Sequence, residues 1–129
     1  MEVRVTVKWT DTAKESLKSL PPKVQHGLLE KADELAQSGS DPRGFCKPLT
    51  GPLQNYYRIV YSRYRAIFTV EEEVLASGDK LLQLTVIFVA AGIRKEFDKR
   101  DVYRVAQKLI ESVLPNLPDI EEFELKKKE

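Results

Sequence analysis

Apolar and polar residues alternate over residues 2–9, where valines and a tryptophan share one side of the chain. An alternation with a period of two, rich in β-branched residues, predicts a half-buried strand. Thr12 and Glu15 have the spacing of a capping box, which predicts that a helix begins at Thr12. The prolines at 21–22 end this helix, and a second apolar stripe predicts another helix over residues 22–37.

The second half of the chain has the pattern of strands followed by a helix. Residues 56–61 and 64–71 alternate, and residues 81–91 are apolar on both faces, as in an interior strand. A glycine- and proline-rich segment without regular structure precedes them. A third apolar stripe predicts a helix that starts near Asp98 or Asp101. The predicted fold class is α+β: an N-terminal strand, a helical hairpin, then a mostly antiparallel four-stranded sheet and a C-terminal helix.

A tight turn at residues 62–63 decides which side chains share a face of this sheet. It pairs residue 61 with 64 and residue 60 with 65, so that tyrosines and aliphatic residues line a core face. The opposite face carries Arg58 and Arg65 at diagonal cross-strand positions. We therefore expect these two arginines to lie within reach of one ligand.

Composition narrows the function classes. The chain has 129 residues, the size of one domain, and a net charge of +1, which gives no overall basic field. A single cysteine, Cys46, and a single histidine, His26, exclude an intrachain disulfide framework and argue against a metal site, so we expect no metal and no cofactor. No signal-peptide pattern or apolar run of roughly 18 residues is present, so we expect a cytoplasmic protein without a membrane partner.

Positive charge is concentrated in one part of the chain. Residues 42–70 contain five cations and no acid, interleaved with tyrosines. The cations are Arg43, Lys47, Arg58, Arg63 and Arg65. Basic groups neutralise phosphates and aromatic rings stack on bases, so this composition is typical of an RNA-contacting surface. A sheet edge with solvated arginines and core tyrosines would have the same composition.

Four ordered stretches resemble the RelE/ParE superfamily of toxins of bacterial type II toxin–antitoxin systems. They are residues 7–20, residues 47–51, the paired strands 57–59 and 64–68, and residues 92–94 leading to Val102-Tyr103. The resemblance covers about residues 3–110. It implies a toxin domain over residues 1–114. The tail at residues 115–129 combines apolar and acidic residues, which a basic groove would bind, so we hypothesise that it folds back on the domain when no partner is present or helps to dock the partner.

The resemblance also implies a partner and an activity. Members of this superfamily are held inactive by a cognate antitoxin protein. RelE-like members cleave mRNA on the ribosome without a metal, and ParE-like members act on DNA gyrase. The residues of this chain that match the catalytic positions of the RelE branch are Arg58, Arg65, Arg94 and Tyr103. The cations expected to bind RNA around them are Lys47, Arg63 and Lys95.

The chemistry of RNA cleavage fits these residue types. The 2′-hydroxyl must be aligned with the adjacent phosphorus, the phosphate charge must be stabilised, and two protons must move. Arginine is suited to bind the phosphate because it is always charged. Tyr103 could serve as the base if nearby cations lower its pKa, and Lys47 or Lys95 could supply a titratable amine. Two departures from the RelE pattern are Val60, where the archetype carries a second lysine, and a longer stretch between Arg94 and Tyr103.

Alternatives remain open at this stage. Arg94 could form a structural ion pair with Glu96 or Asp98, and Tyr103 could simply pack beside the apolar stripe of its helix. The leading hypothesis is a toxin that is a ribosome-dependent mRNA endonuclease. The competing hypotheses are a non-enzymatic gyrase inhibitor and a catalytically weak interaction module of the same fold.

Overall fold

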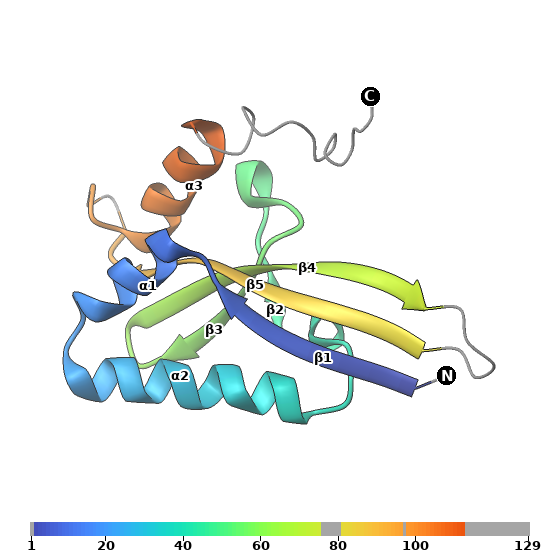
Figure 1. Ribbon diagram of the computed structural model, residues 1–129. Helices are drawn as coiled ribbons and strands as arrows, with labels where there is room; N and C mark the ends of the chain where they lie inside the picture. The colour runs from blue at the N-terminus through green and yellow to red at the C-terminus, as the bar shows by residue number, and fades with distance from the viewer. Residues whose placement is uncertain (1, 76–80, 97, 113–129) are drawn as a thin grey trace.

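A computed structural model describes residues 2–75, 81–96 and 98–112 of the chain (Figure 1). Its regular elements, in chain order, are β1 (Glu2–Trp9), α1 (Asp11–Lys18), α2 (Pro22–Gln37), β2 (Lys47–Pro48), β3 (Tyr57–Tyr61), β4 (Tyr64–Leu75), β5 (Leu81–Ile93) and α3 (Val102–Ser112). Two short 3₁₀ helices, η1 (Pro42–Gly44) and η2 (Gly51–Leu53), flank β2. The predicted α+β class and the order of the main elements are confirmed.

One sheet carries the fold, with the strand order β1-β5-β4-β3-β2. β1 runs parallel to β5, and the other neighbouring strands are antiparallel. The parallel pair is possible because α1, α2 and the β3–β4 hairpin lie between β1 and β5 in the sequence. β5 is thus flanked by strands at both edges, and its two faces contribute to two separate cores, which is why its sequence is apolar on both faces.

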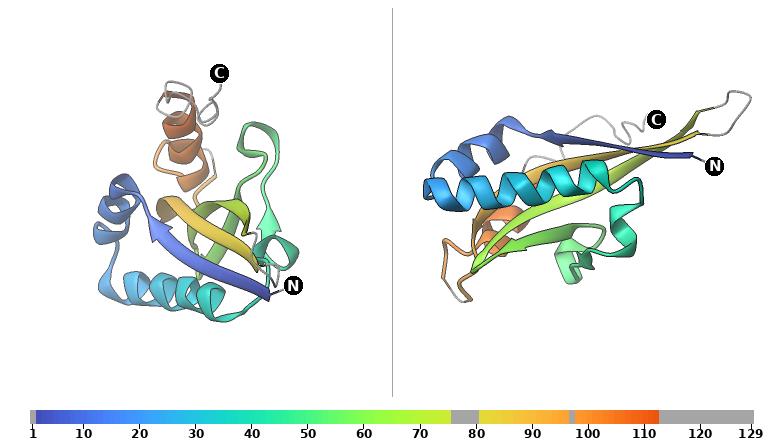
Figure 2. Two further views of the ribbon diagram at one scale, coloured as in Figure 1. Left: turned by 45° about the vertical axis from the view of Figure 1, so that its right-hand side comes forward. Right: turned by 90° about the horizontal axis from the view of Figure 1, so that it is seen from below.

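Helices cover both faces of the sheet (Figures 1 and 2). α1 and α2 pack on one face over the larger core, where Phe68, Phe88 and Leu28 are fully buried. α3 packs on the other face over a smaller core built around Ile67 and Val102. This second, partly covered face is the one that carries the predicted site.

The first helix begins earlier than the capping-box spacing predicts. Thr10, not Thr12, is its N-cap: the Thr10 hydroxyl accepts the N–H of Ala13 at 3.1 Å. The backbone N–H of Thr10 donates to the carbonyl of Phe88, which holds Thr10 in the extended conformation that an N-cap requires. Both threonines have suitable side chains, and the end of β1 selects the first.

The sheet has five strands rather than the predicted four. The additional strand, β2, has two residues, Lys47 and Pro48, which pair with Arg58 and Tyr57 of β3. Two residues show no alternation, and a proline argues against a strand unless it lies at a sheet edge, where its missing N–H costs no ladder bond. β2 is at the edge, so the pattern of the sequence could not reveal it.

Two strands are also longer than predicted. β4 continues to Leu75 and β5 continues through Gly92 to Ile93, whereas Gly92 was expected to end it. Gly92 pairs with Arg65 across the ladder, so the glycine lies inside the sheet. The tail at residues 115–129 lies outside the described residues. None of the described helices is long and apolar enough to cross a membrane.

Candidate functional site

The β3–β4 hairpin has the predicted register. Tyr61 pairs with Tyr64 and Val60 with Arg65, while Arg58 pairs with Ile67. Because Ile67 belongs to the core under α3, Arg58 and Arg65 both lie on the α3 face of the sheet, as predicted. Val60 lies between them on the same face, so an apolar side chain separates the two arginines.

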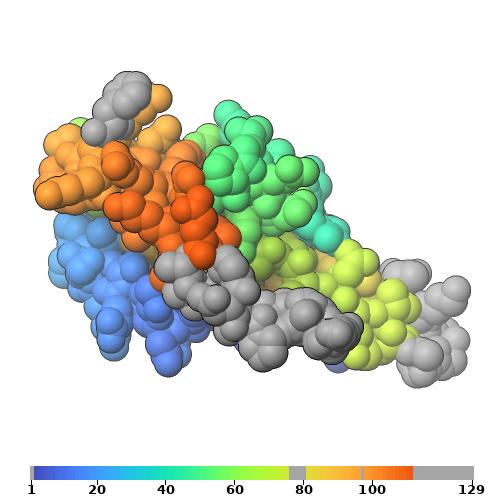
Figure 3. All heavy atoms as spheres, turned by 90° about the horizontal axis from the view of Figure 1, so that it is seen from above, coloured from blue at the N-terminus to red at the C-terminus, as the bar shows by residue number. Residues whose placement is uncertain are grey.

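A hollow of about 470 Å³ opens on this face between α3 and the segment around η2. Figure 3 looks onto this side of the molecule, where α3, in orange-red, lies beside the green segment that contains η2. The hollow is lined by three cations, Lys47, Arg58 and Arg94, and by the phenol of Tyr103. Residues 48–50 and Leu53 complete the lining. Three of the four predicted catalytic residues therefore meet in one place.

Arg58 and Tyr103 are joined directly. The Nη1 of Arg58 donates a hydrogen bond of 2.8 Å to the hydroxyl oxygen of Tyr103, 45 residues further along the chain. The Nε of Arg58 is buried and has no hydrogen-bond partner among the described residues, and no acid in that part of the chain pairs with Arg58. An arginine with an unused donor and an uncompensated charge is suited to bind an anion.

Arg94 is placed by two other contacts. Its Nη1 lies 2.8 Å from a carboxylate oxygen of Asp101, and its guanidinium carbon lies 4.3 Å from the centre of the Tyr103 ring. Glu96 is a weaker partner at 4.0 Å. The hydrogen bond with Asp101 raises the pKa of Arg94 above its ordinary value. The alternative of a structural ion pair is thus realised, with Asp101 in place of the expected Asp98, while Arg94 still lines the hollow.

The predicted RNA-binding cations separate into two groups. Lys47 is exposed, lines the hollow and lies opposite Arg58 in the β2–β3 pair. Lys95 lies outside the hollow, where its Nζ is 3.6 Å from Asp98. Arg63 is exposed in the hairpin turn, and its backbone carbonyl accepts the N–H of Arg94. Only Lys47 of these three adds charge beside Arg58.

Arg65 shares the face but does not line the hollow. Its Nη1 donates to the backbone carbonyls of Ser62 and Tyr64, each at 3.0 Å, so the side chain folds over the hairpin turn. Its Nε is buried without a partner among the described residues, as is that of Arg58. The catalytic role predicted for Arg65 stays a prediction.

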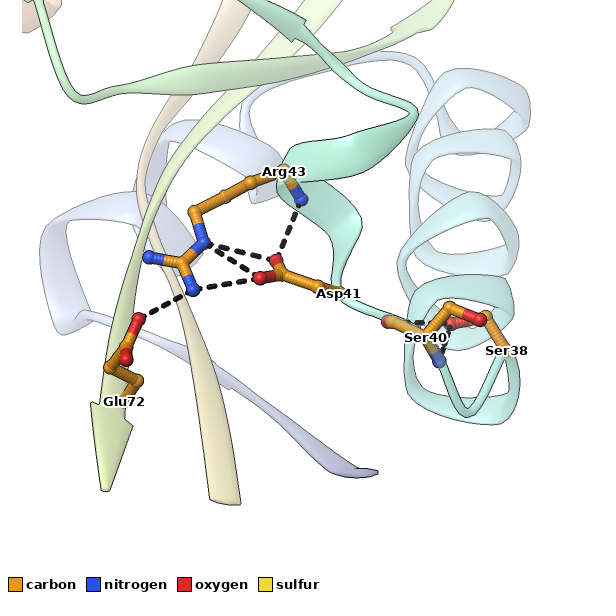
Figure 4. Close-up of polar contacts among 5 residues, drawn as sticks. All are labelled: Ser38, Ser40, Asp41, Arg43 and Glu72. Carbon is orange, nitrogen blue, oxygen red and sulfur yellow. Dashed lines mark hydrogen bonds and ion pairs between the residues drawn. The ribbon is translucent and has the colours of Figure 1, made fainter. Parts of the chain in front are cut away.

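Arg43 contributes little free charge to the basic stretch. Its guanidinium contacts Asp41 at 2.7 Å and Glu72 of β4 at 2.6 Å (Figure 4). The hydrogen bond from Arg43 lowers the pKa of Asp41 below its ordinary value of 3.8. These contacts tie η1 to β4, so Arg43 is a structural arginine.

Asp101 was not among the predicted site residues. In the sequence it could only be interpreted as a residue near the start of a helix. Its burial, with 4% of its surface exposed, depends on how the loop after β5 folds back onto the strand end, and no local pattern encodes that arrangement. The loop explains how a longer stretch still delivers Tyr103: the N–H of Asp98 bonds to Lys95 and that of Asp101 bonds to Asp98 in successive turns.

The arrangement supports anion binding and hydrogen bonding at one spot. Two cations that form no ion pair within the described residues, Arg58 and Lys47, lie beside a tyrosine hydroxyl whose oxygen already accepts one hydrogen bond. The described residues contain no cluster of three or more His, Cys, Asp or Glu side chains that could hold a metal ion.

The chain is similar to solved structures, but not to known protein families. The sequence matches no protein-family model and no curated protein. One chain in a crystal structure of the toxin–antitoxin complex RelBE2 from Mycobacterium tuberculosis is similar in fold, with a TM-score of 0.54 and 26% sequence identity. The match covers 69% of this chain and 96% of that chain.

Proposed function

The chain has the fold of a RelE-family toxin, and from this premise we propose that it is the toxin of a toxin–antitoxin pair and a ribosome-dependent mRNA endonuclease. Its partners are a cognate antitoxin and mRNA on the ribosome, and it acts in the cytoplasm. The observation that carries the proposal is the hydrogen bond between Arg58 and Tyr103 in a hollow that also holds Lys47. A cation with no acidic partner beside a phenol is the combination that cleavage of a phosphodiester needs.

The proposed reaction uses the RNA's own nucleophile. The 2′-oxygen attacks the adjacent phosphorus, the bond to the 5′-oxygen breaks, and the products are a 2′,3′-cyclic phosphate and a 5′-hydroxyl. The proton of the 2′-hydroxyl leaves to a base, and the 5′-oxygen receives a proton. The protein must hold the phosphate in line and assist both transfers.

Each lining residue has a role in this proposal. Arg58 binds the phosphate through its unused N–H groups, because negative charge grows on the phosphate oxygens in the transition state. The Tyr103 oxygen accepts from Arg58, so the Tyr103 O–H remains available to donate to a substrate oxygen. Lys47 occupies the position across from Arg58, and in its neutral form its amine takes the proton of the 2′-hydroxyl, while the Tyr103 O–H donates a proton to the departing 5′-oxygen. Lys47 compensates for Val60, where the mRNA-cleaving archetype has a lysine.

Arg65 and Arg63 belong to the proposal as binding residues on the same hairpin. Arg65 would have to leave the carbonyls of Ser62 and Tyr64 to reach a phosphate outside the hollow. An RNA strand that runs from the hollow along the hairpin turn would meet both side chains.

Inducible expression in a bacterial host tests the function as a whole. We expect growth arrest together with new mRNA 5′ ends inside coding regions. Growth arrest with intact mRNA and loss of DNA supercoiling by gyrase would instead favour the gyrase inhibitor. Normal growth with tight binding to an antitoxin would favour the interaction module.

A further inference from the structure

Asp101 is the one polar or charged residue that is buried within the described part of the chain. A carboxylate in such a place loses its hydration and is tolerated only where other groups satisfy both oxygens. The contacts of Asp101 therefore indicate what this carboxylate does.

Both oxygens point back to the end of β5. One lies 2.8 Å from the Nη1 of Arg94, and the other accepts the backbone N–H of Lys95 at 2.6 Å. Asp101 directly precedes α3, where an aspartate ordinarily accepts an N–H of its own helix. Here its carboxylate contacts the strand end instead, and its backbone carbonyl accepts the N–H of Val105.

These contacts form a closed triangle. Asp101 holds the guanidinium of Arg94, Arg94 lies 4.3 Å from the centre of the Tyr103 ring, and Tyr103 follows Asp101 by two residues in the first turn of α3. The carboxylate thus connects the strand that bears Arg94 with the helix that bears Tyr103. Without this carboxylate, the guanidinium of Arg94 would be free to move, and this contact would no longer fix the angle at which α3 leaves the sheet.

We propose that Asp101 is a positioning residue that fixes Arg94 against the Tyr103 ring and thereby sets the Tyr103 hydroxyl at Arg58. A consequence concerns charge. Because Asp101 compensates the charge of Arg94, the role of Arg94 is to hold the Tyr103 ring. Arg58 and Lys47 are the cations that bind the phosphate. This inference rests on the proposed function only where cleavage is the readout.

Asp101→Asn tests it directly, because it keeps an acceptor for the Lys95 N–H and removes the negative charge. Asp101→Ser removes the charge together with the acceptor at that position. In the NMR spectrum we expect the side-chain protons of Arg94 over the Tyr103 ring to have an upfield ring-current shift in the wild type, and we expect both variants to lose it. In cleavage assays with mRNA on programmed ribosomes, we expect the kcat of both variants to fall about 10- to 100-fold. KM should change less than about threefold, because Arg58 and Lys47 are untouched.

The Arg94→Gln background separates positioning from general loss of structure. Asp101→Asn should cost little further activity there, since its effect acts through Arg94. Asp101→Glu is expected to restore part of the rate and of the ring-current shift.

Three results would overturn the proposal: an unchanged ring-current shift in folded Asp101→Asn, an equal loss of rate with and without Arg94, or failure of both variants to fold, which would make Asp101 a folding residue. The failure of the proposed function is distinguishable. If the wild type cleaves no RNA, the NMR shift and its loss still decide the role of Asp101.

Discussion

The guanidinium of Arg58, on a central strand, donates a 2.8 Å hydrogen bond to the hydroxyl of Tyr103, on the last helix. The contact joins two segments that are 45 residues apart, and it does so at the wall of a hollow lined by Lys47 and Arg94. Because each side chain limits the orientation of the other, the pair presents its remaining donors in one direction.

Replacing Tyr103 with phenylalanine removes only the hydroxyl and keeps the ring under Arg94. We expect cleavage to fall about 100-fold, because a positioned proton-transfer group contributes at least that much, while RNA affinity stays within about threefold. Tyr61→Phe is the matched control, since Tyr61 packs against the larger core beside α2, on the opposite face of the sheet. Equal cleavage activity of Tyr103→Phe and the wild type would show that the Tyr103 hydroxyl takes no part in the reaction.

Replacing Arg58 with alanine removes a guanidinium that lines the hollow and has no acidic partner among the described residues. We expect a loss of cleavage of about 100-fold or more, near 3 kcal/mol of transition-state stabilisation, together with weaker RNA binding. The free energy of unfolding should change by less than about 1 kcal/mol, because the guanidinium makes no ion pair within the described residues. Arg43→Ala is the control: it removes an arginine held by Asp41 and Glu72 and should leave cleavage unchanged.

The two lysines near the site should behave differently. Lys47→Met should reduce cleavage about 100-fold, because it removes the only amine that lines the hollow in the described structure. Lys95→Met should stay within about threefold of the wild type, because Lys95 lies outside the hollow and is paired with Asp98. If Lys95→Met lost more activity than Lys47→Met, the proton transfer would be assigned to Lys95 rather than to Lys47.

Asp41 gives the stability of the fold a pH dependence. Arg43 lowers the pKa of Asp41 in the folded state, so the unfolded chain takes up a proton before the folded chain does as the pH falls. The stabilisation is therefore complete above the ordinary value of 3.8 and is lost below it. The free energies of unfolding of the wild type and Asp41→Asn, measured by chemical denaturation, should differ by less than about 1 kcal/mol at pH 7, and they should converge as the pH falls below 3.8. A difference that grows on acidification would contradict this assignment.

The parts of the site that depend on local pattern could be predicted from the sequence. The alternation in β3 and β4 and the turn between them placed Arg58 and Arg65 on one face, and the register confirms it. Helical spacing placed Tyr103 on the last helix, where the structure has it. These features follow from periods of two and 3.6 residues, which the chain displays directly.

The parts that depend on side-chain partners could not be predicted. Lys47 reaches the hollow through a two-residue strand that has no period, and Arg65 folds back onto carbonyls that no motif specifies. Spacing suggested Glu96 or Asp98 as the partner of Arg94; Glu96 is a distant partner at 4.0 Å, and the close partner is Asp101, because the intervening loop turns twice. The sequence suggests that Arg43 is a free cation, but its charge is compensated by Glu72, which lies 29 residues away in the chain.

The most direct test of the central claim is a cleavage assay with purified protein and a single mRNA held on programmed ribosomes. The account predicts one cut within the ribosome-bound codon, with a 2′,3′-cyclic phosphate on the upstream fragment and a 5′-hydroxyl on the downstream fragment. The cut should depend on ribosomes and be lost in Arg58→Ala. Intact mRNA after prolonged incubation with folded wild-type protein, or fragments that end in a free 3′-hydroxyl, would contradict it.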